Sequence, residues 1–127
     1  MRMILAWGLF LLVPCPIALL AQHAAQSCDD PQTQVQINTC ATQEHERADR
    51  ELNRVYRQLA SRLKGDRLAK LRAAQIAWIK FRDAQCELES AEYARGSMYP
   101  AVLSGCLAAL TKAQVDVLQR ILNDTSK

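Results

Sequence analysis

Few side chains in this chain are of the types and spacings that perform catalysis. Nucleophilic catalysis needs a base beside a serine or a cysteine, and after Ala25 the chain has a single histidine, His45. His45 and Asp49 are four residues apart and would share one face of a helix, but two ligands are too few for a metal site. The sequence has neither a phosphate-binding loop nor a dinucleotide-binding glycine pattern. We therefore expect no catalytic residues, no cofactor and no metal ion.

Cysteines are the other reactive side chains. Four of the five follow Ala25, and an even number in a small exported domain is typical of a disulfide framework; they are Cys28, Cys40, Cys86 and Cys106. Turns near residues 65 and 97 would bring Cys40, Cys86 and Cys106 to one end of the molecule. Twelve residues of continuous helix would hold Cys28 about 18 Å from Cys40, beyond disulfide reach. We therefore predict that Cys28 and Cys40 each join a downstream cysteine, Cys86 or Cys106, and both crossings stay open.

The first 25 residues have the order of a secretory signal peptide. A basic residue, Arg2, precedes the uncharged apolar run 3–13, and a further apolar stretch follows two prolines. A membrane span needs about 20 continuous apolar residues, and the prolines interrupt this segment. We expect cleavage after Ala21 or Ala25, leaving a periplasmic or secreted protein without a stable membrane span.

Composition leaves room for one domain, residues 26–127, after the signal peptide 1–25. The full chain has 16 basic and 13 acidic residues, and loss of Arg2 with the signal peptide leaves a net charge of +2. Aromatic residues make up 6%, which is little for stacking on bases. A nearly neutral chain with few aromatic side chains argues against a nucleic-acid partner.

The elements that must position these residues are predicted to be helices. Apolar residues at steps of three and four predict a first helix over residues 32–64, which Asp30 and Pro31 start and Gly65 ends. Asp66 is expected to cap a second helix, whose wide apolar arc predicts contact with two neighbouring helices. Glycine, serine and proline interrupt the pattern before a third helix over 100–122. The predicted fold is all-α, a small antiparallel three-helix arrangement stapled by two disulfides.

Two motifs resemble the LprI-type lysozyme-inhibitor domain family. Residues 48–56 fit AD-x-x-LN-x-x-Y, and residues 71–86 fit L-x-x-x-Q-x-x-W-x-x-x-R-x-x-x-C. Together with Thr42-Gln43, Gly96-Ser97 and Cys106, the resemblance covers residues 28–122. It implies an exported, helical, disulfide-containing domain, one member type of which inhibits lysozyme.

The resemblance suggests an exported cell-envelope binding protein that inhibits lysozyme-type peptidoglycan hydrolases. The alternative is a structural or interaction protein of the envelope with no hydrolase target. Its partner would be a hydrolase in the first case and another envelope protein in the second. The net charge of the mature chain argues against inhibition, because a charge of +2 gives no attraction to the strongly basic animal-type lysozymes.

Polar residues of the two motifs have a structural interpretation. Asp49 and Arg82 lie at similar distances from the turn near residue 65, and so do Asn53 and Gln75. We expect each pair to meet across adjacent helices and to fix their register. Tyr56 and Trp78 are predicted to be core anchors.

The loop before the third helix is the predicted partner-binding region. Gly96, Ser97 and Tyr99 stand in a turn that could project a hydroxyl and a phenol towards the carboxylates of a hydrolase cleft. The competing interpretation is that this loop only connects two helices.

Overall fold

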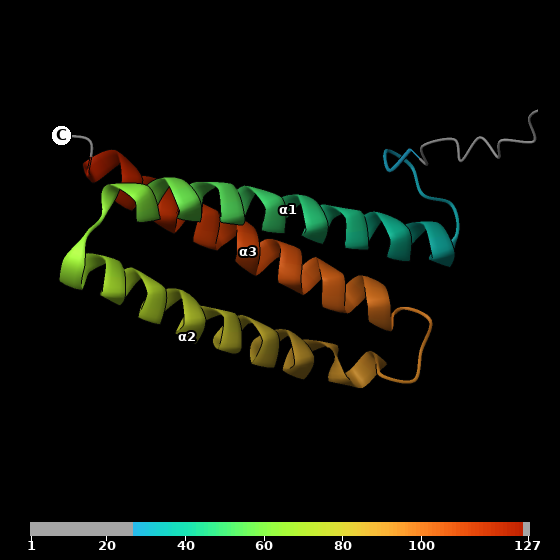
Figure 1. Ribbon diagram of the computed structural model, residues 1–127. Coiled ribbons are helices and arrows are strands. Elements are labelled where there is room, and N and C mark those ends of the chain that lie inside the picture. The colour runs from blue at the N-terminus through green and yellow to red at the C-terminus, as the bar shows by residue number, and fades with distance from the viewer. Residues whose placement is uncertain (1–26, 126–127) are drawn as a thin grey trace, which may run out of the picture.

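A computed structural model describes residues 27–125, which form three long helices (Figure 1). They are α1 (Gln34–Arg62), α2 (Gly65–Ser90) and α3 (Tyr99–Asp124), with a short 3-10 helix, η1 (Ala91–Tyr93), after α2. No strand occurs within residues 27–125. The predicted all-α, three-helix fold with two disulfides is confirmed. The expected signal peptide lies outside the described residues.

Consecutive helices are antiparallel, so α1 and α3 run in the same direction and lie side by side (Figure 1). This arrangement gives the molecule two ends. The loop end holds the start of α1, the end of α2 and the start of α3. The hairpin end holds the turn between α1 and α2 and the C-terminus of α3.

The ends of α1 differ from the sequence prediction. Its N-terminus is a capping box in which the Thr33 hydroxyl accepts from the Gln36 backbone N–H, and the Gln36 side chain accepts from the Thr33 N–H. The expected start at Asp30 is therefore wrong. Gly65 has a φ of 55°, the left-handed conformation expected of a turn residue. It opens α2, however, because α1 already ends at Arg62.

The main core lies towards the hairpin end. Buried side chains of all three helices meet there, namely Leu52, Val55, Leu59, Leu63, Leu71, Leu118 and Leu122. Tyr56 and Trp78, the predicted anchors, are half-buried and pack against this cluster. The core thus fixes the hairpin end, and other contacts must hold the loop end together.

The most heavily packed helix is α3, because it contacts both α1 and α2 extensively. By length and composition α3 is apolar enough to cross a membrane, and 17% of its most apolar stretch is buried in the bundle. The second helix was expected to contact two neighbouring helices, whereas most of its packing is against one. α2 packs mainly against α3 and leaves Ile76, Phe81 and Leu88 exposed.

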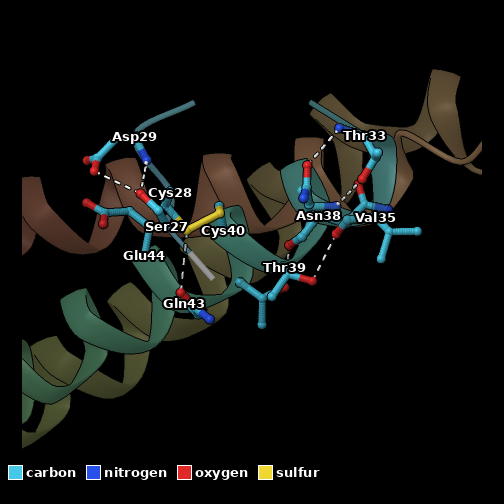
Figure 2. Close-up of a disulfide and its surroundings, with 12 residues drawn as sticks. Ser27, Cys28, Asp29, Thr33, Val35, Asn38, Thr39, Cys40, Gln43 and Glu44 are labelled. Carbon is cyan, nitrogen blue, oxygen red and sulfur yellow. Dashed lines mark hydrogen bonds between the residues drawn. A yellow bond between two sulfur atoms is a disulfide. The ribbon is translucent and has the colours of Figure 1, made fainter. Parts of the chain in front are cut away.

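One disulfide joins Cys28 to Cys40 (Figure 2), and the other joins Cys86 to Cys106. The predicted crossing of both upstream cysteines to downstream ones is therefore wrong. The capping box starts α1 at Gln34, so the chain from 27 to 33 is not helical and folds back along α1. The Cα atoms of Cys28 and Cys40 are consequently 5.6 Å apart. The other bridge ties α2 to α3 near the loop end, where the leucine core is absent.

Candidate functional site

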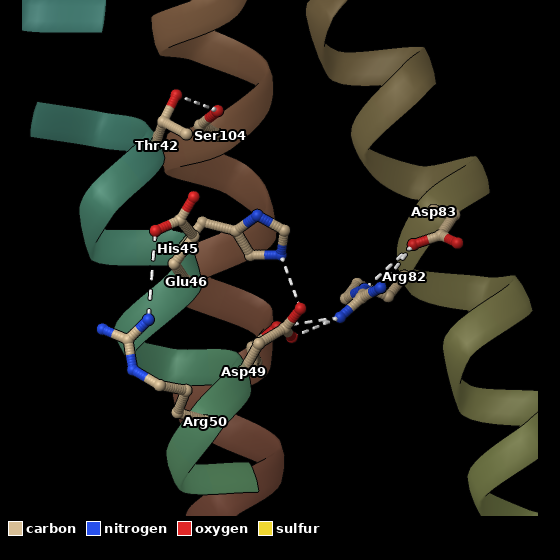
Figure 3. A network of polar contacts seen from close by, with 9 residues as sticks. Thr42, His45, Glu46, Asp49, Arg50, Arg82, Asp83 and Ser104 are labelled. Atoms are coloured by element: carbon tan, nitrogen blue, oxygen red, sulfur yellow. Dashed lines mark hydrogen bonds and ion pairs between the residues drawn. The ribbon is translucent and has the colours of Figure 1, made fainter. Parts of the chain in front are cut away.

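Arg82 connects the three helices through polar contacts (Figure 3). Its guanidinium donates to Asp49 Oδ1 of α1 at 3.0 Å and to the Thr111 hydroxyl of α3 at 3.2 Å. Arg82 also pairs with its neighbour Asp83 at 2.9 Å and lies 5.2 Å from the centre of the Trp78 ring, within cation–π range. Only 12% of the Arg82 side chain is exposed. The structure thus brings Asp49 and Arg82 together and adds Thr111, which the sequence did not single out.

The second expected pair is not among the hydrogen bonds of the described residues. Gln75 accepts from the Gln114 amide of α3 at 3.4 Å, and Asn53 is exposed on α1. The reason is the position of α2, which packs mainly against α3. Gln75 therefore links α2 to α3 instead of α1.

His45 sits beside this network (Figure 3). Its Nε2 atom lies 3.4 Å from Asp49 Oδ2 and is inaccessible to solvent, yet it forms no hydrogen bond. Among residues 27–125 no group of three or more His, Cys, Asp or Glu side chains could hold a metal ion. His45 therefore packs within the helix bundle, and its Nε2 atom is buried without a hydrogen-bond partner.

The loop before α3 is held in a defined conformation. The Ser97 carbonyl accepts from the Asn38 amide at 2.9 Å, and the Gly96 N–H donates to the Tyr93 carbonyl at 2.7 Å. Gly96 and Ser97 are exposed at the tip. Tyr99 is half-buried and lines a hollow between α2 and α3 together with Leu103. Of the predicted contact residues, Gly96 and Ser97 are thus presented outward, and Tyr99 lies to the side.

Charge is strongly segregated between the two ends. The segments that form the loop end, 27–46 and 83–111, contain eight carboxylates and one basic residue, Arg95. The rest of the described chain, 47–82 and 112–125, contains thirteen basic residues and five carboxylates. The respective net charges are −7 and +8. Total charge hides this division, which the sequence shows once its segments are assigned to the two ends.

Glu44 marks the boundary between the two charged regions. Its carboxylate accepts hydrogen bonds from Lys112 of α3 and from Arg47 of α1. These cations, Lys112 foremost, lower the pKa of Glu44 from 4.5 to about 2. Glu44 therefore stays ionised at physiological pH and links α1 to α3 above the leucine core.

These features define a small, disulfide-stapled three-helix domain with an acidic and a basic end. The family is shown by its model, described as lysozyme inhibitor LprI, which matches residues 25–118. The chain belongs to the LprI lysozyme-inhibitor family.

Two further proteins are similar to this chain over most of its length. The crystal structure of a DUF1311 family protein from Pseudomonas putida KT2440 is similar, with a TM-score of 0.66 and 25% identity. That similarity covers 73% of this chain and 97% of the other. An uncharacterized protein of Rhizobium meliloti (strain 1021) is 37% identical over 128 residues, covering 91% of this chain and 92% of the relative. The fold is therefore shared with the Pseudomonas protein over nearly that protein's whole length, and the sequence similarity extends over 92% of the Rhizobium protein.

Proposed function

We propose that the mature chain is an exported cell-envelope protein that inhibits lysozyme-type peptidoglycan hydrolases by covering their substrate cleft. The family match over residues 25–118 carries this proposal. Blocking a cleft needs no catalytic group, which agrees with the lack of an evident active site in the sequence. Two disulfides are typical of an oxidising compartment, and the signal-like start of the chain favours the same location, the periplasm or the extracellular space.

The loop end is the surface that we assign to the hydrolase. Its net charge of −7 would attract a basic lysozyme, and the basic end would point away from it. The net charge of +2 argued against attraction to a basic lysozyme. The separation of charge answers this argument, because a lysozyme that approaches the loop end is closer to the acidic residues than to the basic ones. The tip itself, residues 96–99, is uncharged. Ser97 could therefore approach the cleft carboxylates without like-charge repulsion.

Charge reversal tests this orientation. Glu89 and Glu92 are exposed carboxylates of the loop end, and Asp116 is an exposed carboxylate of the basic region. We expect Glu89→Lys combined with Glu92→Lys to slow association with a basic lysozyme about tenfold at low salt. The matched control is the double variant Asp116→Lys with Asp124→Lys, which makes the same change in charge within the basic region. It should leave the association rate within twofold of wild type. Equal slowing by both double variants would contradict the assigned orientation.

Loop variants test the contact. Ser97→Ala should weaken the complex more than fivefold, as removal of a binding hydroxyl does, and leave the melting temperature unchanged because Ser97 is exposed. Tyr99→Phe removes the phenol hydroxyl and keeps the half-buried ring. If both variants bound lysozyme with unchanged affinity, the loop would only connect two helices.

The alternative is an envelope interaction protein with no hydrolase target. Capture of an endogenous envelope protein by the oxidised mature chain, together with full activity of every lysozyme tested, would favour it. A complex that also abolishes hydrolysis would favour inhibition.

A further inference from the structure

One side of α2 carries an apolar stripe that the rest of the described chain does not cover. Phe81 is 57% exposed and Leu88 is 71% exposed. Both belong to a set of exposed residues at alternating steps of three and four, namely Ala74, Ala77, Phe81, Ala84 and Leu88. That alternation is the a/d spacing of a helix that pairs with another helix. The buried residues of α2, such as Leu71 and Cys86, lie on a different side.

We propose that this stripe is the interface of a homodimer, in which α2 pairs with α2 of a second copy in antiparallel orientation. A two-fold axis makes such a contact self-complementary, because each residue repeats its contact on the other side of the axis. The inference is independent of lysozyme binding, which we assign to the loop end.

The sizes of the side chains select one register. With the axis between positions 82 and 83, Phe81 lies opposite Ala84 of the second copy, and Leu88 lies opposite Ala77. Each bulky side chain then meets an alanine, and two helices can approach closely when large and small residues alternate. Sliding the pair by one heptad towards the hairpin end would place Leu88 opposite Lys70. The central register is therefore the one that the stripe fits.

Charges beside the stripe select the same register and the antiparallel direction. Lys80 and Glu87 flank it on one side, both are exposed, and neither has a salt bridge among the described residues. In the antiparallel pair, Lys80 of each copy faces Glu87 of the other, so two ion pairs form. In a parallel pair, Lys80 would face Gln85 instead. The unpaired charges thus complement a second copy of this helix.

Exposed positions make the apolar contact testable without disturbing the fold. We expect the oxidised mature protein to dimerise with a micromolar dissociation constant, since one helix pair is a small interface. Phe81→Glu and Leu88→Glu should each weaken dimerisation at least tenfold in sedimentation equilibrium, with unchanged circular dichroism. Ile76→Glu is the matched control, because Ile76 is 59% exposed on another side of α2. It should leave the dimer intact.

Charge exchange tests the register. Lys80→Glu and Glu87→Lys should each weaken the homodimer, and the double variant should restore it. An equimolar mixture of the two single variants should form a heterodimer, because opposite charges then face each other at both contacts. A monomeric wild-type protein at millimolar concentration, equal disruption by Ile76→Glu, or failure of the double exchange to restore dimerisation would each overturn the proposal.

Discussion

Replacing Arg82 by methionine removes the only side chain shown to donate hydrogen bonds from α2 to both other helices among residues 27–125. A hydrogen bond to a charged group contributes about 1.5–3 kcal/mol, and we take the lower value for Asp49 because it is 39% exposed and can rehydrate. Thr111 is fully buried and loses its donor, which costs about 1 kcal/mol more. Arg82→Met should therefore lower the free energy of unfolding by about 2–3 kcal/mol and the melting temperature by roughly 10 °C.

Urea unfolding followed by far-UV circular dichroism measures this loss. Arg72→Met is the matched control, since Arg72 is an exposed arginine of the same helix, and it should stay within about 0.5 kcal/mol of wild type. A double-mutant cycle with Asp49→Ala should give a coupling energy of at least about 1 kcal/mol. A loss below about 0.5 kcal/mol for Arg82→Met, or no coupling to Asp49, would refute the view that this contact stabilises the bundle.

Three further outcomes are expected in the same unfolding assays. Replacing Cys86 and Cys106 by alanine should cost about 3 kcal/mol, because the bridge closes a loop of 20 residues. Trp78→Ala should cost about 2 kcal/mol, below the usual range for a buried tryptophan, because Trp78 is half-buried. Hydrogen bonds from Lys112 and Arg47 lower the pKa of Glu44 from 4.5 to about 2, so the stabilisation by this carboxylate is fully present above pH 4.5 and is lost as the pH falls through about 2. Glu44→Gln should remove less than about 1 kcal/mol at neutral pH and reduce the acid dependence of thermal melts.

Each of these outcomes can fail on its own. Equal stability with and without the Cys86–Cys106 bridge would mean that the helices hold the loop end unaided. A Trp78→Ala loss above about 4 kcal/mol would place the ring in the core. An identical acid dependence for wild type and Glu44→Gln would exclude Glu44 as its source.

Apolar periodicity predicted the helices well, and it failed where polar residues decide the structure. The third helix was expected over 100–122 and spans Tyr99–Asp124. The start of α1 was missed because Thr33 and Gln36 set it through hydrogen bonds, which an apolar pattern does not register. That error carried over to the disulfides, since a non-helical segment before Gln34 lets Cys28 reach Cys40.

Relations between helices were harder to predict than the helices themselves. The apolar arc of α2 indicated how much of the helix could be buried, but not which part the chain itself would cover. The distribution of charge was equally hard to predict, because a net charge close to zero does not show that acidic and basic residues gather at opposite ends of the molecule. Similar distances from the turn near residue 65 correctly predicted the contact between Asp49 and Arg82. The same reasoning failed for Asn53 and Gln75, because α2 packs mainly against α3.

The most direct test of the central claim is a titration of a basic animal-type lysozyme with the oxidised mature protein, following complex formation by calorimetry and peptidoglycan hydrolysis in parallel. We predict a complex of fixed stoichiometry, loss of hydrolysis in proportion to its formation, and affinity that falls as salt is added, because the acidic loop end faces the enzyme. No heat of binding and full hydrolysis at micromolar concentration, repeated with bacterial-type and phage-type lysozymes, would contradict the assignment of this chain as an inhibitor.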